Sequence, residues 1–333
     1  MSALDIERHD ELVRYLRESG RIAPDERPAV RTLGGGVSNR TVLLERESGE
    51  QWVLKQALEK LRVQADWFCP PERIHREALG LHWLARLAPA GTITPFVFED
   101  RARHVLAMAA VPQPHENWKT MLLAGDLRAG HVERFGLLLR SIHRNALEHR
   151  RPLRRTFGDR SFFERLRLEP YYAYAGERVP EAAGFLAELV AETRAHRDTL
   201  VHGDFSPKNV LVRGDELVLV DHEVVHFGDP AFDLGFSLAH LLSKAHHLRD
   251  RRDDFAAAAL LYWRTYAEDA DPELEPRAVR HTLACLLARV AGRSPLEYLD
   301  DGERARQQAA VLALLPAPPQ TLDGLVEGIV AAL

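Results

Sequence analysis

The spacing of apolar residues divides the chain into an early part with strands and a longer part with helices. Short β-branched or aliphatic runs at 30–33, 41–45, 51–57, 94–98 and 104–109 are typical of strands. One helix is predicted among them, at 71–84, where apolar residues recur three and four positions apart. Beyond residue 110 the same helical spacing predicts helices at 115–124, 132–142, 185–197, 234–246, 251–268, 275–291, 303–314 and 320–332. The chain therefore combines a small sheet with a helical lobe.

The first twenty residues carry isolated apolar side chains among charges, which predicts an amphipathic helix rather than a signal peptide. No stretch approaches the roughly 20 consecutive apolar residues of a membrane span. The length of 333 residues suits two lobes, and 46% hydrophobic with 28% charged residues is ordinary for a soluble globular protein. We therefore expect a cytoplasmic protein that does not bind membranes.

Net charge and cysteine content bear on the class of ligand and on the redox compartment of the protein. The formal net charge of −5 argues against a nucleic-acid binder, although a local patch could still accept a small anionic substrate. Cys69 and Cys285 are isolated, so they match neither a disulfide framework nor a zinc site. They indicate a reducing compartment.

Two apolar runs at 210–212 and 217–220 flank Arg213-Gly214-Asp215-Glu216, a pattern that predicts a tight hairpin. Because both ends of a hairpin lie together, Asn209 at its start is expected near Asp221 at its end. Amide and carboxylate oxygens are the ligands that Mg²⁺ prefers in proteins. The predicted metal ligands are Asn209, Asp221 and Glu223.

Asp204 stands five residues before Asn209, in His202-Gly203-Asp204. It is expected close to the metal ligands without being one of them. That is the position of a residue that accepts a proton from a substrate hydroxyl.

These motifs carry a family resemblance. The pattern His-Gly-Asp-x-x-x-x-Asn, Asp-x-Glu and Gly-Asp-Pro-x-x-Asp-Leu-Gly resembles the aminoglycoside phosphotransferase and choline kinase-like superfamily, which is related to protein kinases. The resemblance implies an α+β, bilobal protein-kinase-like fold, with a small antiparallel-sheet N-lobe at 1–109 and a mainly helical C-lobe at 110–333. It implies a catalytic base at Asp204, metal ligands at Asn209, Asp221 and Glu223, and support of the catalytic loop by His202 and Asp233.

Phrases outside the core motifs look most like the 5-methylthioribose-kinase-like side of this superfamily. They are Val-Leu-Lys-Gln-Ala-Leu at 53–58, Asn-Trp-Lys around 118 and Asp-His-Glu at 221–223. The expected function is ATP- and Mg²⁺-dependent transfer of a phosphoryl group to a hydroxyl of a small molecule, such as a sugar or nucleoside-like metabolite. An aminoglycoside or amino-alcohol acceptor is the alternative, and a non-catalytic nucleotide-binding protein is an alternative of another class.

The N-lobe supplies candidate nucleotide contacts. The glycine-rich turn at 34–39 lets backbone N–H groups approach phosphate oxygens, although such turns are also common in ordinary hairpins. Lys55 lies in an apolar strand and needs a partner, for which the resemblance favours Glu77 over Glu72. An ordinary surface role for Glu77 stays open. The candidate nucleotide-binding residues are Gly34, Gly35, Gly36, Ser38, Lys55 and Glu77, with Ala109 and Val111 in the hinge whose backbone would bind adenine.

The acceptor is expected to rest on the helical lobe. Trp118 offers an apolar face there, and Arg289 and Arg293 offer hydrogen-bond donors. Arginines at the cleft favour a neutral or anionic polyol over a cationic aminoglycoside. Two segments give no clear pattern: the long connection 57–70 either overhangs the cleft or packs through Trp67, and 150–178 lacks helical periodicity.

Overall fold

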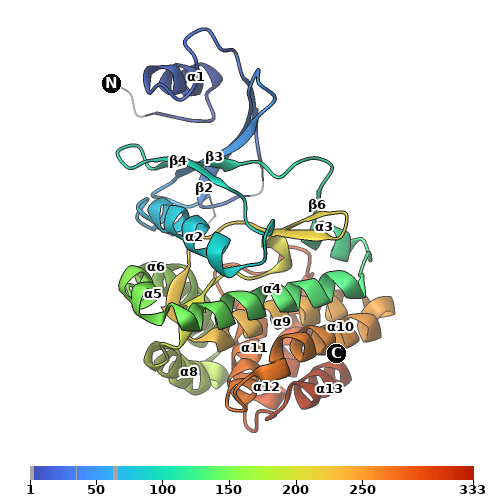
Figure 1. Cartoon of the computed structure of the whole chain (residues 1–333). Coiled ribbons are helices and arrows are strands. Elements are labelled where there is room, and N and C mark those ends of the chain that lie inside the picture. The colour runs from blue at the N-terminus through green and yellow to red at the C-terminus, as the bar shows by residue number, and fades with distance from the viewer. Residues whose placement is uncertain (1–3, 35, 63–66) are drawn as a thin grey trace.

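A computed structural model describes residues 4–34, 36–62 and 67–333, and it has a sheet-containing lobe above a helical lobe (Figure 1). The sheet is antiparallel, with strand order β1-β2-β3-β5-β4. The α+β, bilobal fold class is thus confirmed. The five strands are β1 Ala29–Thr32, β2 Asn39–Glu45, β3 Gln51–Ala57, β4 Phe96–Asp100 and β5 Val105–Ala109.

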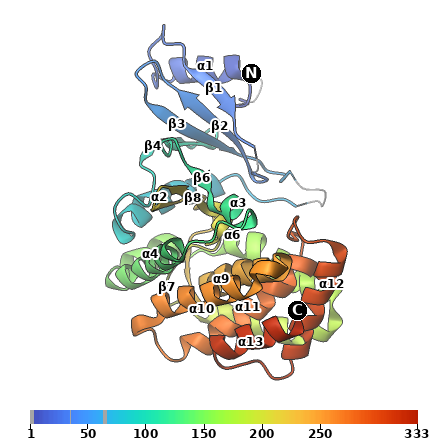
Figure 2. The ribbon, with the colours of Figure 1, turned by 90° about the vertical axis from the view of Figure 1, so that its right-hand side faces the viewer.

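Side chains alternate between the two faces of the sheet, and each face packs against a different hydrophobic core. In β5, Val105 and Ala107 belong to a small outer core with helix α1 (His9–Glu18), whereas Leu106 and Met108 belong to the main core. Helix α2 (Arg73–Leu87) joins that main core and lies between the sheet and the helical lobe (Figures 1 and 2). The N-lobe helix that follows Lys55 is therefore packed against both lobes.

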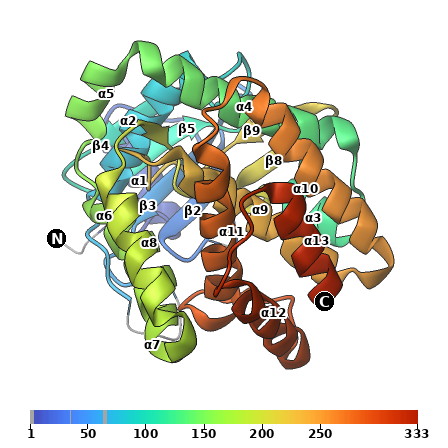
Figure 3. The same ribbon diagram turned by 90° about the horizontal axis from the view of Figure 1, so that it is seen from below.

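The helical lobe is built around α9, in which every residue from Pro230 to His246 is buried. Helices α10 and α11 pack against it (Figure 3). A π-helix at Glu164–Ala173 separates α6 from α7. The helices are α3 Trp118–Leu123, α4 Ala129–Glu148, α5 Arg150–Phe157, α6 Ser161–Phe163, α7 Tyr174–Arg178, α8 Ala183–Ala195, α9 Pro230–His247, α10 Arg252–Tyr266, α11 Leu274–Ala291, α12 Asp301–Leu314 and α13 Leu322–Ala332, with short 3₁₀ turns at Pro180–Ala182, Pro207–Asn209, Arg249–Arg251 and Ala267–Asp269.

Gly235 allows α9 and α11 to cross closely. A Cβ atom at this position would lie only 2.4 Å from the Cβ of His281 in α11. Any side chain here would force the helices apart, and the loops that precede α9 would move with it. The glycine of the Asp-Leu-Gly motif is thus explained by helix packing.

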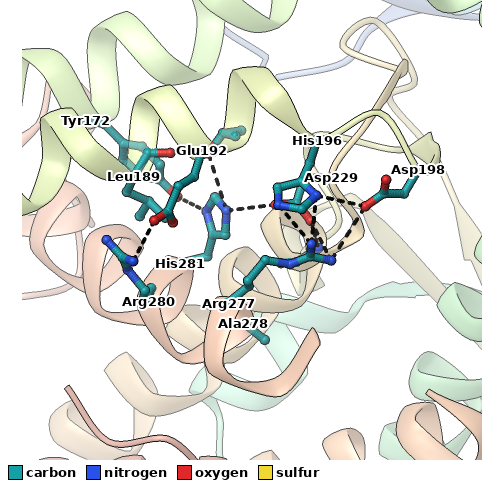
Figure 4. Close-up of polar contacts among 12 residues, drawn as sticks. Tyr172, Leu189, Glu192, His196, Asp198, Asp229, Arg277, Ala278, Arg280 and His281 are labelled. Carbon is teal, nitrogen blue, oxygen red and sulfur yellow. Dashed lines mark hydrogen bonds and ion pairs between the residues drawn. The ribbon is translucent and has the colours of Figure 1, made fainter. Parts of the chain in front are cut away.

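A polar network that includes His281 fixes the start of α9 (Figure 4). Asp229 caps the helix by accepting a hydrogen bond from the N–H of Ala231 at 3.0 Å. Its other carboxylate oxygen lies 3.7 Å from Nε2 of His281, and Arg277 lies 3.6 Å from both Asp229 and Asp198. The network ties α9 and α11 to the segment that leads into β7.

Short strands hold the loops that carry the motifs. The predicted hairpin is present as β8 (Val210–Arg213) and β9 (Glu216–Leu219), and β6 (Glu116–Asn117) pairs with β8. Strand β7 (Thr199–Val201) pairs with β10 (His226–Gly228). We propose the lobe boundary at 109/110, because β5 ends there and the next strand already belongs to the helical lobe.

The structure explains why the segments 150–178 and 57–70 show no clear sequence pattern. The π-helix in 150–178 follows a wider spacing than 3.6 residues per turn and contains Pro170, so a search for helical periodicity misses it. In the connection 57–70, Trp67 is buried and donates from Nε1 to the carbonyl of Arg165 at 3.1 Å, while 63–66 lie outside the described residues. Among the helices that the structure describes, none has the length and apolar character needed to cross a membrane.

Candidate active site

A cleft of about 690 Å³ opens between the two lobes. Its walls come from the glycine-rich turn, β3, the hinge after β5 and the hairpin that begins at Asn209. Gly35 lies outside the described residues. The predicted site residues that line the cleft are Gly34, Gly36, Ser38, Lys55, Ala109, Val111, Asn209 and Asp221.

Lys55 of β3 is held between two carboxylates. Its Nζ lies 2.6 Å from Oε1 of Glu77 in α2 and 2.8 Å from Oδ1 of Asp221 after β9. Burial alone would lower the pKa of Lys55, but Asp221 and Glu77 outweigh burial and raise this pKa above its ordinary value. The structure thus pairs a permanently charged Lys55 with Glu77 rather than with Glu72.

Asp221 adopts an unusual backbone conformation where it leaves β9, with φ of 70°. Burial alone would raise the pKa of its carboxyl, but Lys55 holds this pKa below its usual range. Helix α2 approaches closely because residue 80 is glycine: a Cβ there would lie 2.8 Å from the Cβ of His222. The close approach brings Glu77 to within 3.4 Å of the N–H of His222.

Glu223 is anchored by Arg73, a residue that the sequence analysis missed. Oε2 of Glu223 accepts hydrogen bonds at 3.1 Å from both Nε of Arg73 and Nδ2 of Asn39. The fully buried Arg73 also donates to the carbonyls of Ser38 and Leu58. It therefore connects the glycine-rich turn, the 57–70 connection and the acidic loop.

Removing the Arg73 guanidinium should destabilise the protein strongly. Arg73→Met leaves the buried Glu223 carboxylate without its cation, a change that typically costs about 3–5 kcal/mol. We expect a fall of this order in the free energy of unfolding by urea. Adding Glu223→Gln should restore part of the loss, because the uncompensated charge is then gone. A single variant within roughly 0.5 kcal/mol of wild type, the range of ordinary surface substitutions, would contradict this role.

The acidic residues form a donor set that suits a hard cation. Carboxylate oxygens of Glu77, Asp221 and Glu223 lie within 4.8 Å of one another. The hairpin brings Asn209 to the same place, since its carbonyl accepts the N–H of Val220 at 2.9 Å. Carboxylate and amide oxygens are the ligands that Mg²⁺ prefers, so these residues fit the expected metal.

Asp233, at the start of α9, holds the loop before Asp204 in place. Its two carboxylate oxygens accept the backbone N–H groups of His202 at 2.7 Å and Gly203 at 2.8 Å. His143 supports Asp233 from α4, with Nε2 at 3.2 Å from Oδ2. His202 reaches the acidic loop, where its Nε2 lies 3.0 Å from Nδ1 of His222. The two loops are therefore linked through buried histidines.

Asp204 is held on both oxygens. Oδ1 lies 2.7 Å from Nη2 of Arg167, and Oδ2 accepts a hydrogen bond from Nδ2 of Asn209 at 2.7 Å. Arg167, which the sequence analysis also missed, comes from the π-helix and further donates from Nε to the carbonyl of Gly203 at 2.7 Å. A fixed carboxylate thus stands directly beside the candidate metal ligands.

The comparison with protein families agrees with this geometry. A family model described as the phosphotransferase enzyme family matches residues 29–270. The chain belongs to the phosphotransferase enzyme family. The predicted family relationship and the predicted phosphotransferase class are confirmed by this match, and solved aminoglycoside phosphotransferases and choline kinases share the fold.

Solved structures share the fold of this phosphotransferase at low sequence identity. A choline/ethanolamine kinase family protein from Mesorhizobium loti has a TM-score of 0.56 and 17% identity over 97% of this chain and 99% of that chain. An amicoumacin kinase has a TM-score of 0.61 and 13% identity over 94% of this chain and 98% of that chain. A choline kinase from Streptococcus pneumoniae has a TM-score of 0.55 and 14% identity over 91% of this chain and 99% of that chain. The search of curated proteins found no match.

The expectation that Trp118 faces the acceptor is wrong. The indole of Trp118 is fully buried in the phosphotransferase core, with its ring 4.8 Å from that of Phe135. Asn117 caps α3 by accepting the N–H of Lys119 at 3.1 Å, which turns the tryptophan inward. An acceptor therefore cannot rest on this side chain.

The two predicted acceptor arginines lie in different surroundings. Arg289 is buried at the end of α11, where Nη1 donates to the hydroxyl of Tyr171 at 2.9 Å. Arg293 lies 4.9 Å above the ring of Tyr174. Their role towards an acceptor stays a prediction.

The hinge and the glycine-rich turn leave backbone groups for a ligand. The N–H of Ala109 is already bonded to the carbonyl of Pro95 at 2.8 Å, so adenine recognition by Ala109 is restricted to its carbonyl. Val111 also lines the cleft. A Cβ at Gly34 would meet no atom within 4 Å, and one at Gly36 would lie 3.7 Å from the nearest. Packing therefore does not require glycine at these positions, and space remains for a ligand.

A wider groove of about 1070 Å³ lies along α8, α11 and the end of α12. Arg280 in this groove is paired with Glu192, 2.7 Å away, and Figure 4 draws this contact. It contains none of the residues that surround Asp204 and Lys55. We therefore propose that the active site of the phosphotransferase lies in the smaller cleft.

Lys244 of α9 is a fully buried lysine in the same lobe. Burial, together with the charges of Lys119 and Arg289, lowers its pKa to about 7, and Glu297 opposes this change. Its Nζ donates to the carbonyl of His240 at 3.2 Å. Carrying a positive charge here therefore costs the folded protein stability.

This cost should appear as a pH dependence of stability. Between about pH 7 and the ordinary lysine pKa of 10.5, the unfolded chain holds a proton on Lys244 that the folded chain has released, so the free energy of unfolding rises with pH. Lys244→Met removes this contribution. The free energy of unfolding of the variant should therefore exceed that of wild type by most at or below about pH 7. Urea unfolding of both proteins at several pH values measures the difference. A difference that does not change with pH would contradict the prediction.

Proposed function

We propose that this protein is an ATP- and Mg²⁺-dependent kinase that moves the γ-phosphoryl group to a hydroxyl of a small molecule. The observation that carries the proposal is the position of Asp204. Its carboxylate lies 2.7 Å from the amide of Asn209, which lines the same cleft as Asp221 and Lys55. The cleft wall thus brings together a fixed cation and oxygen ligands for a metal, and a carboxylate for the acceptor hydroxyl is bonded to one of those ligands.

The N-lobe would bind the nucleotide. Lys55 supplies a fixed positive charge to its phosphates, and the open turn at Gly34 and Gly36 leaves room for phosphate oxygens. Adenine would lie against the carbonyl of Ala109 and the N–H of Val111. The similar fold of an amicoumacin kinase in complex with AMP-PNP supports ATP as the donor.

The helical lobe would position the reaction. Asn209, Asp221 and Glu223 would hold Mg²⁺, which when bound neutralises charge on the transferred phosphoryl group. Asp204 orients the acceptor hydroxyl and accepts its proton as the new bond forms. Arg167 and Asn209 keep this carboxylate fixed. Because the transition state is loose, positioning by Asp204 counts for more than its strength as a base.

A sugar or nucleoside-like metabolite is the acceptor that we propose. An aminoglycoside or an amino alcohol is the alternative acceptor. An aminoglycoside phosphotransferase and a choline kinase have similar folds. A non-catalytic nucleotide-binding protein is disfavoured because Lys55, Asp204, Asn209 and Asp221 are all present in one site. We also propose a cytoplasmic location, since both cysteines are free thiols.

A coupled assay of ADP release over sugars, nucleosides, amino alcohols and aminoglycosides tests the proposal. At least one hydroxyl compound should raise ADP release well above the rate with MgATP alone. Omitting Mg²⁺ should abolish that increase. Efficient phosphorylation of an aminoglycoside alone would favour the alternative acceptor class, and no increase with any compound would favour the non-catalytic alternative.

A further inference from the structure

A path of packed side chains leads from Asp204 to a second arginine. Arg167, which contacts Asp204, and Arg289 both lie over the ring of Tyr171, each with its guanidinium carbon 5.6 Å from the ring centre. The same two arginines lie 5.6 and 6.0 Å from the ring centre of Phe236. Arg289 is therefore two side chains away from the candidate catalytic carboxylate.

Lys244 and Lys119 continue this cluster. Both contact the ring of Tyr298, with Nζ of Lys244 at 5.5 Å and Nζ of Lys119 at 5.9 Å from its centre. Lys119 also lines the cleft between the lobes. The cations thus extend from the buried end of α9 to the wall of the active-site cleft.

Positive charge exceeds negative charge in this region. Asp204 is paired with Arg167, and Lys119 is paired with Glu297, whose side chain is 65% exposed. Within the described part of the chain, neither Lys244 nor Arg289 forms an ion pair, and the buried Nε of Arg289 has no hydrogen-bond partner. Placing two basic groups inside the fold without an anion is costly whenever both are protonated, so a role in protein stability does not explain why they are there.

We propose that the acceptor alcohol carries an oxyanion, a phosphate or a carboxylate, which binds Lys244 and Arg289 while its hydroxyl faces Asp204. The proposal rests on the proposed kinase function and adds the charge class of the acceptor. An oxyanion supplies the negative charge that the two cations lack, and charge-assisted hydrogen bonds to it are strong. A cationic acceptor would meet repulsion from the same groups.

Thermal unfolding with inorganic phosphate as the probe tests this inference. Saturating MgADP occupies the nucleotide site, and sodium chloride at equal ionic strength controls for screening. Phosphate should then raise Tm in a saturable manner, and choline chloride should not. Acetate provides the second arm: a larger shift with phosphate identifies a phosphate-bearing acceptor, and a larger shift with acetate identifies a carboxylate. No saturable shift with either anion would overturn the proposal.

Two variants and a matched control locate the binding. Lys244→Met and Arg289→Gln should each raise the dissociation constant of the preferred anion by roughly tenfold or more, because each removes a charged hydrogen-bond donor. Lys244→Met should also raise Tm without ligand, which separates a binding role from a structural one. Arg264→Gln removes an exposed arginine of α10 that pairs with Asp323, and it should leave anion binding unchanged.

The outcomes separate this inference from the kinase proposal. A rise in Tm with MgADP alone supports the nucleotide site, whatever the anions do. If that rise is present and both variants bind the anion as wild type does, the anion subsite is wrong and the kinase proposal stands. If Lys244→Met lowers Tm and leaves anion binding intact, Lys244 is a structural residue and the inference fails.

Discussion

Asp221→Ala should abolish Mg²⁺-dependent phosphoryl transfer, with turnover falling by roughly 10³ or more. The variant loses a carboxylate ligand of the proposed metal and also one of the two partners of Lys55, which lies 2.8 Å away. Glu77 still holds Lys55 at 2.6 Å, so metal-free nucleotide binding should persist. Mg²⁺ titrations of turnover and of nucleotide affinity measure both effects.

Glu223→Gln is the matched control for this prediction. Glu223 is already bound by Arg73 and Asn39, so its replacement should reduce turnover less than the loss of Asp221. An Asp221→Ala enzyme that responds to Mg²⁺ and ATP as wild type does would place the metal elsewhere.

Asp204→Asn should lower turnover by roughly 10² to 10⁴ while MgATP affinity stays nearly unchanged. The amide keeps the shape of the side chain but cannot accept the proton of the acceptor hydroxyl. The lower end of the range is compatible with a loose transition state, which asks little of a base. Steady-state kinetics combined with direct nucleotide binding separate the two quantities, and wild-type turnover in the variant would refute the assignment.

Local spacing explains why several site residues could be predicted from the sequence. A tight hairpin brings its two ends together, so Asn209 was expected near Asp221, and its carbonyl indeed accepts the N–H of Val220, the residue before Asp221. Lys55 in an apolar strand needed a carboxylate, and the next helix supplied Glu77. In each case a short stretch of chain determines the geometry.

Long-range contacts explain what the sequence analysis missed. Arg73 meets Glu223 across 150 residues, and Arg167 comes from a π-helix whose spacing matches no ordinary helical pattern. Trp118 was expected to offer an apolar face to the acceptor, yet the cap formed by Asn117 turns it into the core. Buried arginines and single aromatic side chains depend on tertiary packing that no local pattern records.

Net charge was similarly uninformative about the acceptor. The chain carries a formal charge of −5, yet its helical lobe places Lys119 and Lys244 against the ring of Tyr298 and Arg289 over the ring of Tyr171. Helices that are far apart in sequence bring these cations together. The arginines in the sequence left a neutral or an anionic acceptor open, and the cations that the fold brings together favour the anionic one.

Transfer of a labelled phosphoryl group tests the central claim most directly. The protein is incubated with Mg²⁺, with ATP that carries ¹⁸O in its γ-phosphoryl group, and with each acceptor that raises ADP release; the products are analysed by mass spectrometry. We predict a phosphate monoester of the acceptor alcohol that carries the label, formed by wild type and nearly absent with Asp204→Asn. Label found only in inorganic phosphate, or equal ester formation by the two proteins, would contradict the account.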